Sequence, residues 1–207
     1  MTTKIYSLIL FVSLYWFVCL YIGFKTQKKV AIPVDYFIFG RQVPNWSYIT
    51  IMTGTVFSGW IFFVQPSLVF INGLSFAMTS LFVIAIPLIG ILFSKRQWMF
   101  SKKFGFVTPG EMIGAYFKSD ILRVLIVVIT LGFAIPFIAM QLYLGGLLIS
   151  ILSDELINPG SAAILIGAVM VVYLNLGGMR SIIYINAFQF LFFIFGIICI
   201  GFITYDL

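Results

Sequence analysis

Long apolar runs separated by short polar loops dominate the chain. A helix that spans a bilayer needs about 20 apolar residues, and six runs reach or approach that length: 5–24, 47–72, 75–93, 121–151, 162–176 and 181–204. The fourth run is too long for an upright span, so we expect strong tilt or a kink at Pro136. The pattern predicts an all-α integral membrane protein with about six transmembrane helices in a single domain, residues 1–207.

The basic residues predict which way these helices cross the bilayer. Lys and Arg near helix ends accumulate on the cytoplasmic side. Of the 12 Lys and Arg, all but Lys4 follow the first, third or fifth run, whereas Asp154, Glu155 and Asp206 lie at the opposite ends. We therefore expect the N-terminus outside a plasma membrane, and an even number of spans returns the C-terminus to the same side.

The composition excludes several classes of protein. With 62% hydrophobic and 9% charged residues, the chain differs strongly from a soluble domain. Topology explains the net charge of +6, so we expect no nucleic-acid partner. The chain has no His, and Cys19 and Cys199 lie inside apolar runs, which argues against a Cys/His metal centre. No Asp, Glu, His or Lys falls in the middle of a predicted span, so we expect no enzyme activity.

Two loops have local signals of their own. The loop after the first run contains aromatic residues, among them Tyr36 and Trp46, that suit the headgroup level of a membrane. Between the third and fourth runs, Thr108 followed three residues later by Glu111 fits a capping box. This motif predicts a short surface helix that ends near Phe117.

Small and polar residues gather in the second run: Thr50, Thr53, Gly54, Thr55, Ser58, Gly59, Gln65 and Pro66. Gly and Pro weaken a helix interior, which predicts a local break from Thr53 to Ser58. Broken backbone inside a membrane persists where it is buried in protein or lines a cavity, and its carbonyl groups are then good ligands for Na⁺. Alternatively, the same residues form a face on which helices pack closely.

Gln141, Asn186 and Gln189 are further polar side chains inside apolar runs. An unsatisfied amide in hydrocarbon costs several kcal/mol, so these side chains must face protein or water. Hydrogen bonds between helices would satisfy them as well as a solute would. Gly177 and Gly178 permit a tight turn between the last two runs, and a plain connector is the simplest interpretation of that turn.

Several motifs occur in a fixed order along residues 35–189. They are Asp35-Tyr36-Phe37 with Gly40-Arg41, Ser58-Gly59-Trp60 with Pro66 and Gly73, FVTPGEMIGAYF at 106–117, Ile135 to Gln141 with Gly145-Gly146, and Tyr173 to Gln189. In this order they resemble the sodium:solute symporter family, which includes proline, pantothenate and sugar symporters. The resemblance implies the inverted-repeat fold of the leucine-transporter type, built from two five-helix repeats.

That resemblance also implies where the sites lie. Residues 5–24 would be a leading helix and residues 47–204 the first core repeat, with the C-terminal repeat absent. The implied cation site uses the backbone carbonyl groups of Gly54 and Phe57, with Ser58 beside them. The implied substrate contacts are Ser58, Trp60, Ile61, Gln65 and Gln141, and Asn186 and Gln189 would form a gating or second polar site.

Two positions differ from the family pattern. Val56 stands where the proline symporters have a carboxylate, and Asn186 stands where many members have an aspartate. The first difference bears on subtype. The second removes the charge that a second cation site or a proton-linked gate would use, although Asn can still form hydrogen bonds.

The leading hypothesis is a secondary active transporter that couples Na⁺ to the entry of a small organic solute by alternating access. On this hypothesis the chain is an N-terminal half or fragment whose partner is the missing C-terminal repeat. Na⁺ is the coupling ion, and no other cofactor or metal is expected. The alternative is a membrane sensor or interaction domain derived from a symporter that transports nothing. The identity of the solute and the choice between Na⁺ and H⁺ stay open.

Overall fold

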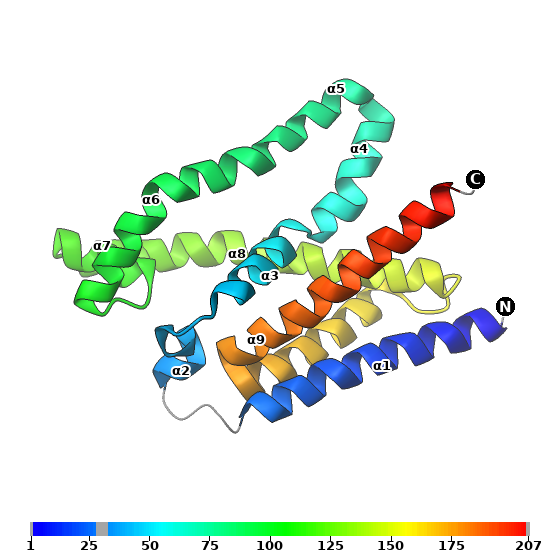
Figure 1. The fold of residues 1–207 in the computed structure, drawn as a ribbon, viewed down its shortest axis with the longest axis horizontal. Helices are drawn as coiled ribbons and strands as arrows, with labels where there is room; N and C mark the ends of the chain where they lie inside the picture. Colours follow the sequence, from blue (N-terminus) through cyan, green and yellow to red (C-terminus); the bar gives the residue numbers. More distant parts are fainter. Residues whose placement is uncertain (1, 28–32, 206–207) are drawn as a thin grey trace. The chain divides into compact units, whose positions relative to one another are not determined.

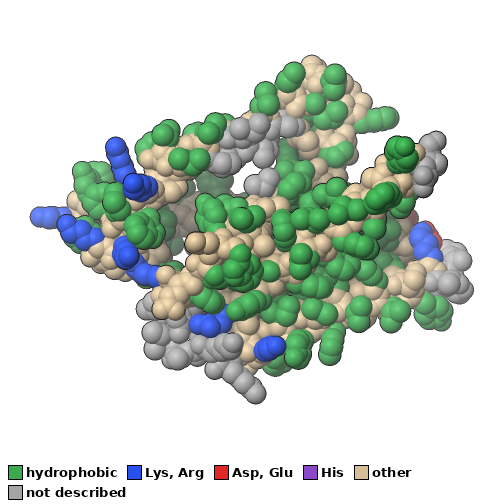
Figure 2. All heavy atoms as spheres, viewed as in Figure 1, with side chains coloured by type: hydrophobic (Ala, Val, Ile, Leu, Met, Phe, Trp, Pro, Cys, Tyr) green, Lys and Arg blue, Asp and Glu red, His purple; other side chains and the backbone are tan. Residues whose placement is uncertain are grey.

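The computed structural model describes residues 2–27 and 33–205, which form helices and the turns between them (Figure 1). These ranges contain no β-strand, which confirms the all-α prediction. Apolar side chains cover much of the face seen in Figure 2, as expected for helices in contact with lipid. The chain divides into a first unit, Met1–Gly59 with Leu142–Leu207, and a second unit, Trp60–Gln141.

The first unit is built on a long helix and a helical hairpin. Helix α1 (Thr2–Gln27) packs along α9 (Pro159–Tyr205), and α2 (Pro33–Ile38), the short 3₁₀ turn η1 (Phe39–Arg41) and α3 (Asn45–Val56) complete the unit together with the end of α8. The segment expected to be an interfacial loop therefore contains a short helix, α2.

Helix α9 is two helices joined at Gly178, where φ is 54° and ψ is −142°. The two arms, residues 159–177 and 179–205, run back along each other beside α1 (Figure 1). Buried Cys19 of α1 packs there with Tyr173 and Ile185 from the two arms. At Gly23 the helices approach so closely that a Cβ would lie 3.1 Å from the Cβ of Tyr173.

The turn of this hairpin is more than the plain connector that the sequence suggested. A Cβ at Gly178 would lie 2.5 Å from the Tyr36 carbonyl oxygen, and one at Gly177 would overlap the Thr26 hydroxyl. The Ser181 hydroxyl, which is fully buried, donates to the carbonyl groups of Tyr173 and Gly178 at 3.0 and 2.9 Å. The turn is therefore packed between α1 and α2, and both glycines are needed for that packing.

The second unit begins with a π-helical segment, η2 (Trp60–Val64), followed by α4 (Gln65–Asn72). After Gly73 come α5 (Leu74–Ala77), the 3₁₀ segment η3 (Met78–Leu81) and α6 (Phe82–Phe104). The third apolar run was expected to end at Phe93, but α6 continues to Phe104 and ends only at Gly105, which has a left-handed conformation. Hydropathy marks the limit of the hydrocarbon layer, whereas the helix ends where its backbone can turn.

The predicted capping box is confirmed at the start of α7 (Pro109–Phe117). The Thr108 hydroxyl accepts the Glu111 amide at 3.2 Å, and the Glu111 carboxylate accepts the amides of Val107 and Thr108 at 2.7 and 3.2 Å. These amide donors lower the pKa of the Glu111 carboxyl below its ordinary value, because they stabilise its charged form. The short surface helix therefore exists where the sequence placed it.

Helix α8 (Asp120–Leu152) continues from the second unit into the first with Pro136 in its interior. Its 33 residues correspond to about 50 Å, well beyond a ~30 Å hydrocarbon core. The helix continues through Pro136, and the predicted strong tilt or kink stays a prediction.

Three helical segments in the described residues are long and apolar enough to cross a membrane: Lys4–Gln27, Asp120–Leu152 and Pro159–Tyr205. The bent pair Asn45–Thr55 and Trp60–Asn72 qualifies as a fourth. Since Pro159–Tyr205 is a hairpin, it contains both of the last two predicted runs. The membrane class is confirmed, and the count of six spans stays a prediction.

Candidate functional site

Helix α3 ends inside the polar cluster of the second run. The Phe57 amide still donates to the Thr53 carbonyl group at 2.9 Å, but Phe57 itself leaves the helix with ψ of 73°. The sequence predicted a break from Thr53 to Ser58. In the structure the break begins later, and it comprises Phe57 and Ser58. As at every helix end, the carbonyl groups of the last turn, including that of Gly54, receive no hydrogen bond from an amide within α3.

Gly54 lies within the regular part of α3 and does not break it. A Cβ at this position would lie 3.9 Å from the Asn186 Oδ1 of α9, so the second arm of α9 runs close beside α3. Two turns further along that arm, the ring of Phe193 lies 4.6 Å from the ring of Phe57. The contacts place the carboxamide of Asn186 beside the end of α3, a proximity that sequence spacing did not reveal.

Beyond the break, the chain forms the π-helical turn of η2, a geometry that occurs often at functional sites. Pro66, which the sequence suggested would weaken a helix interior, instead lies in the first turn of α4, where a missing amide donor costs little. The irregular stretch is thus short, from Phe57 to Val64, and regular helix resumes at Gln65.

The other candidate substrate residues belong to the second unit. Trp60 and Ile61 lie in the π-helical segment, and the indole N–H of Trp60 is buried without an acceptor in the described part of the chain. Gln65 donates from its side-chain amide to the Thr79 hydroxyl at 3.3 Å. Gln141 lies within α8 at the end of this unit.

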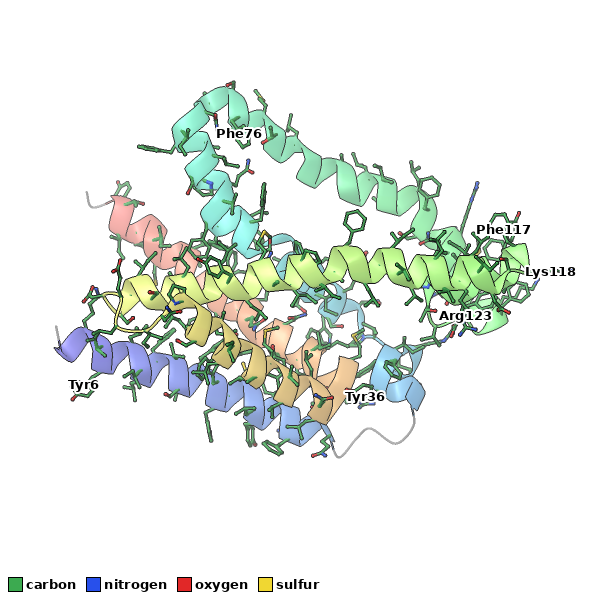
Figure 3. The ribbon with its side chains drawn as sticks, turned by 180° about the vertical axis from the view of Figure 1, so that it is seen from behind. Tyr6, Tyr36, Phe76, Phe117, Lys118 and Arg123 are labelled. Atoms are coloured by element: carbon green, nitrogen blue, oxygen red, sulfur yellow. The ribbon has the colours of Figure 1, made fainter. Side chains whose placement is uncertain are left out.

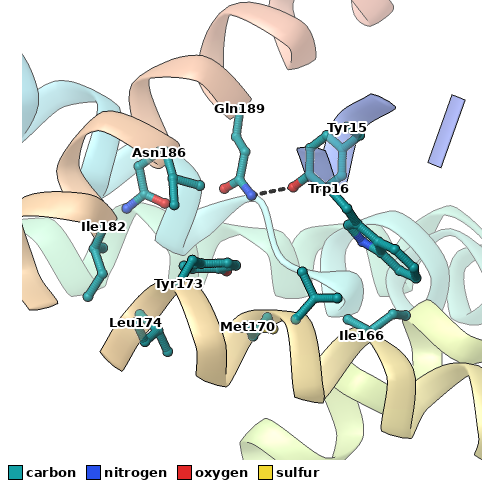
Figure 4. A pocket seen from close by; sticks show the side chains of 11 residues that line it. Tyr15, Trp16, Ile166, Met170, Tyr173, Leu174, Ile182, Asn186 and Gln189 are labelled. Atoms are coloured by element: carbon teal, nitrogen blue, oxygen red, sulfur yellow. Dashed lines mark hydrogen bonds between the residues drawn. The ribbon is translucent and has the colours of Figure 1, made fainter. Parts of the chain in front are cut away.

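A cavity of about 290 Å³ lies between α1 and the two arms of α9 (Figure 4). Its polar groups are Tyr15 from α1, Tyr173 from the first arm, and Asn186 and Gln189 from the second arm. The Gln189 amide donates to the Tyr15 hydroxyl across the cavity. Interhelical hydrogen bonding, the alternative left open by the sequence, is therefore what Gln189 does in this structure.

Tyr15 was not among the residues singled out from the sequence, and Tyr173 was named only as the first residue of a family motif. The available signal was a tyrosine in the middle of an apolar run, because a buried hydroxyl group requires a hydrogen-bond partner. Asn186 lines the same cavity and also lies beside Gly54, so it connects the cavity with the end of α3.

The donor chemistry around the end of α3 suits a hard cation. Backbone carbonyl, hydroxyl and carboxamide oxygens are the available groups, and such neutral oxygens bind ions like Na⁺ or Ca²⁺ rather than soft metals. Among the residues that the structure describes, no group of three or more His, Cys, Asp or Glu could hold a metal ion.

The long apolar helices define an integral membrane protein, and one of its helices breaks beside neutral polar groups. The model of the sodium:solute symporter family matches residues 36–206, and the chain belongs to that family. No curated protein and no solved structure matches it. The matched range begins at α2, so α1, with Tyr15 and Trp16 of the cavity, lies outside it.

Proposed function

We propose that this chain provides the leading helix and the first five-helix repeat of a Na⁺-coupled symporter for a small organic solute in the plasma membrane. The family consists of Na⁺-coupled solute transporters, not enzymes. The observation that supports the proposal best is the end of α3 at Val56, beside Asn186, in a chain of this family. The proposed cation ligands are the carbonyl groups of Gly54 and Phe57 and the hydroxyl group of Ser58.

The electrostatics of a helix end support this assignment. The C-terminal end of a helix has a partial negative charge that favours a cation. The neutral oxygen of the Asn186 carboxamide adds a polar group there without adding a full charge. Na⁺ bound at this position would connect α3 to the second arm of α9, and so favour one arrangement of these helices over the other, as alternating access requires.

The proposed solute contacts lie directly after the same break. Trp60 supports this part of the proposal, because its buried indole N–H can donate only to an acceptor that another molecule or another segment supplies. Together with Ser58 and Trp60, the proposed solute contacts are Ile61, Gln65 and Gln141. The proposed gating contacts are those of Asn186 and Gln189, of which Gln189 binds the leading helix through Tyr15.

Replacing Ser58 with alanine tests the cation site. We expect Ser58→Ala to raise the Na⁺ concentration for half-maximal solute uptake by about tenfold or more, because one ligand to a charged group is worth about 1.5–3 kcal/mol. The measurement is Na⁺-dependent uptake by whole cells that produce the transporter with both repeats. Ser67→Ala is the matched control, since the Ser67 hydroxyl at the start of α4 donates to the Phe63 carbonyl group, four residues earlier in η2. An unchanged Na⁺ dependence in Ser58→Ala would contradict the site.

The proposed orientation has its own test. In a background without Cys19 and Cys199, we expect single cysteines at Gln27 and Gln97 to be protected from an impermeant thiol reagent in intact cells, and one at Asn158 to react. All three positions are exposed, so the reagent reports the side of the membrane. The reverse labelling pattern would mean that the N-terminus is inside. Lys28, Lys29 and Asp206, which contribute to the orientation argument, lie outside the described residues.

A further inference from the structure

Half of the chain's Lys and Arg residues lie in residues 94–123 of the second unit: Lys95, Arg96, Lys102, Lys103, Lys118 and Arg123. This segment comprises the last turns of α6, all of α7 and the first turn of α8. Figure 2 shows basic side chains gathered at this end of the second unit. We call residues 94–123 the basic end.

Only two acidic residues lie in the basic end, and the structure gives both a local role. Glu111 accepts the amides of Val107 and Thr108, and its carboxylate lies 3.9 Å from the Arg123 guanidinium. Asp120 lies in the first turn of α8, where the helix dipole favours a negative charge. Neither carboxylate neutralises the lysines of α6, so the basic end has an excess of positive charge.

Helical geometry separates cations from aromatic rings along the end of α6. At 100° per residue, Lys95, Arg96, Lys102 and Lys103 fall within an arc of about 120°. The remaining arc contains Trp98, Phe100 and Phe104, whose side chains are exposed. At the margins of the two arcs the Lys102 ammonium lies 4.9 Å from the Trp98 ring centre, and that of Lys103 lies 5.4 Å from the Phe104 ring centre.

A second group of cations surrounds a hollow between α7 and α8. This hollow, of about 420 Å³, is lined by Lys118, Ser119 and Arg123 together with the two carboxylates of this segment, Glu111 and Asp120. Close packing fixes its walls, because a Cβ at Gly114 would lie 3.0 Å from the Cβ of Arg123. Figure 3 shows Phe117, Lys118 and Arg123 together at this end of the two helices.

Exposed aromatic rings accompany these cations too. Tyr116 is 77% exposed and Phe117 is 61% exposed, and their ring centres lie 4.9 Å apart. Exposed aromatic rings beside Lys and Arg are typical of protein surfaces at the level of lipid headgroups, where the ring meets the acyl boundary and the cation meets phosphate. A soluble anion would account for the cations and leave the aromatic side chains unexplained.

We propose that the basic end binds the headgroups of anionic phospholipids. Lys102, Lys103, Lys118 and Arg123 contact the phosphate groups, Ser119 adds a hydroxyl donor, and the exposed aromatic side chains lie among the glycerol and upper acyl groups. Charge complementarity selects anionic over zwitterionic lipid, because positive groups at a membrane surface are attracted to phosphatidylglycerol and phosphatidylserine but not to phosphatidylcholine. The proposal does not depend on the Na⁺ or solute site, so its test is independent of the test of the proposed function.

The test measures lipid binding to the purified chain in detergent by native mass spectrometry. Phosphatidylglycerol and phosphatidylcholine with identical acyl chains are the two probes. We expect phosphatidylglycerol to bind more tightly, and we expect Lys102→Gln/Lys103→Gln/Lys118→Gln to reduce its affinity at least tenfold, given about fivefold for each charge near a lipid surface. Equal affinities for the two lipids would overturn the proposal.

Three controls keep the result specific. Lys102→Arg/Lys103→Arg/Lys118→Arg keeps the charges and should keep the preference for phosphatidylglycerol, even if the glutamine variant is partly unfolded. Lys4→Gln/Lys25→Gln removes charges outside the basic end and should also keep it. Inorganic phosphate at millimolar concentration should not displace the lipid. Loss of the preference in either variant, or displacement by phosphate alone, would contradict lipid binding at this surface.

Discussion

Replacing Gly178 with alanine is expected to destabilise the first unit by about 2–6 kcal/mol. Two effects add: the backbone at φ 54° and ψ −142° is strained for any residue with a Cβ, which costs about 1–3 kcal/mol. The new Cβ would also lie 2.5 Å from the Tyr36 carbonyl oxygen, an overlap that costs a further 1–3 kcal/mol or so. The free energy of unfolding is measured by circular dichroism in mixed micelles of increasing dodecyl sulfate content.

Gly196 provides the matched control on the same helix. Apart from the backbone of its own helical turns and its two chain neighbours, no heavy atom of the described residues lies within 4 Å of a Cβ at Gly196, and its backbone is helical. Gly196→Ala should therefore leave stability unchanged or raise it by up to about 1 kcal/mol, since alanine is the better helix former. Similar losses in Gly178→Ala and Gly196→Ala would show that the hairpin turn is not the close-packed point that these contacts describe.

Residues 1–207 reconstituted alone in liposomes are expected to show no solute uptake driven by a Na⁺ gradient. Coupling requires Na⁺ and solute to share a cavity between two walls that move against each other, and in an inverted-repeat core each five-helix repeat forms one wall. With one repeat, the proposed Na⁺ site has the Gly54 and Phe57 carbonyl groups and the Ser58 hydroxyl, fewer oxygens than a hard cation needs. A second copy in the same orientation does not supply the inverted repeat.

The measurement uses radiolabelled proline, pantothenate and glucose as probes, with an inward Na⁺ gradient and, in parallel, an inward K⁺ gradient. Liposomes that contain an intact symporter of the family show that the gradient is maintained. Uptake by residues 1–207 should equal that of empty liposomes. Saturable accumulation that requires the Na⁺ gradient would show that one repeat is sufficient, and would refute the two-wall argument.

The two results would separate folding from transport. If Gly178→Ala destabilises the chain while the unaltered chain is well folded but inactive, residues 1–207 fold as a structural unit that requires a partner for function. The buried contacts of Cys19, Tyr173 and Ile185 join the leading helix α1 to α9 within the first unit, so they contribute to that folding.

Local signals in the sequence were sufficient for the membrane class and for several boundaries. Apolar runs of bilayer length indicate helices whatever their neighbours are, because lipid itself satisfies their side chains. The capping box at Thr108 and Glu111 was equally predictable, since both partners lie within one turn of each other. The turn at Gly177 and Gly178 was located correctly for the same reason, although its packing was not foreseen.

Boundaries that depend on more than composition were less accurate. Helix α6 continues past Phe93 through Lys95 and Arg96, because charged residues are good helix formers and only the hydrocarbon layer excludes them. The break in the second run lies at Phe57 rather than Thr53, because one glycine costs a helix interior only about 1 kcal/mol and α3 continues through Gly54 to Val56. In each case the sequence indicated the right segment but not the residue at which the helix ends.

The sequence by itself determined that this is an all-helical membrane protein, that neutral polar residues are concentrated in its second apolar run, and that its basic residues gather in certain loops. Only the tertiary structure decided that Asn186 lies beside Gly54, that Tyr15 accepts a hydrogen bond from Gln189, and that Gly178 packs on Tyr36. The reason is physical: hydropathy and capping depend on residues within a few positions, whereas these contacts join residues more than 100 positions apart, whose distance is set by how closely whole helices pack.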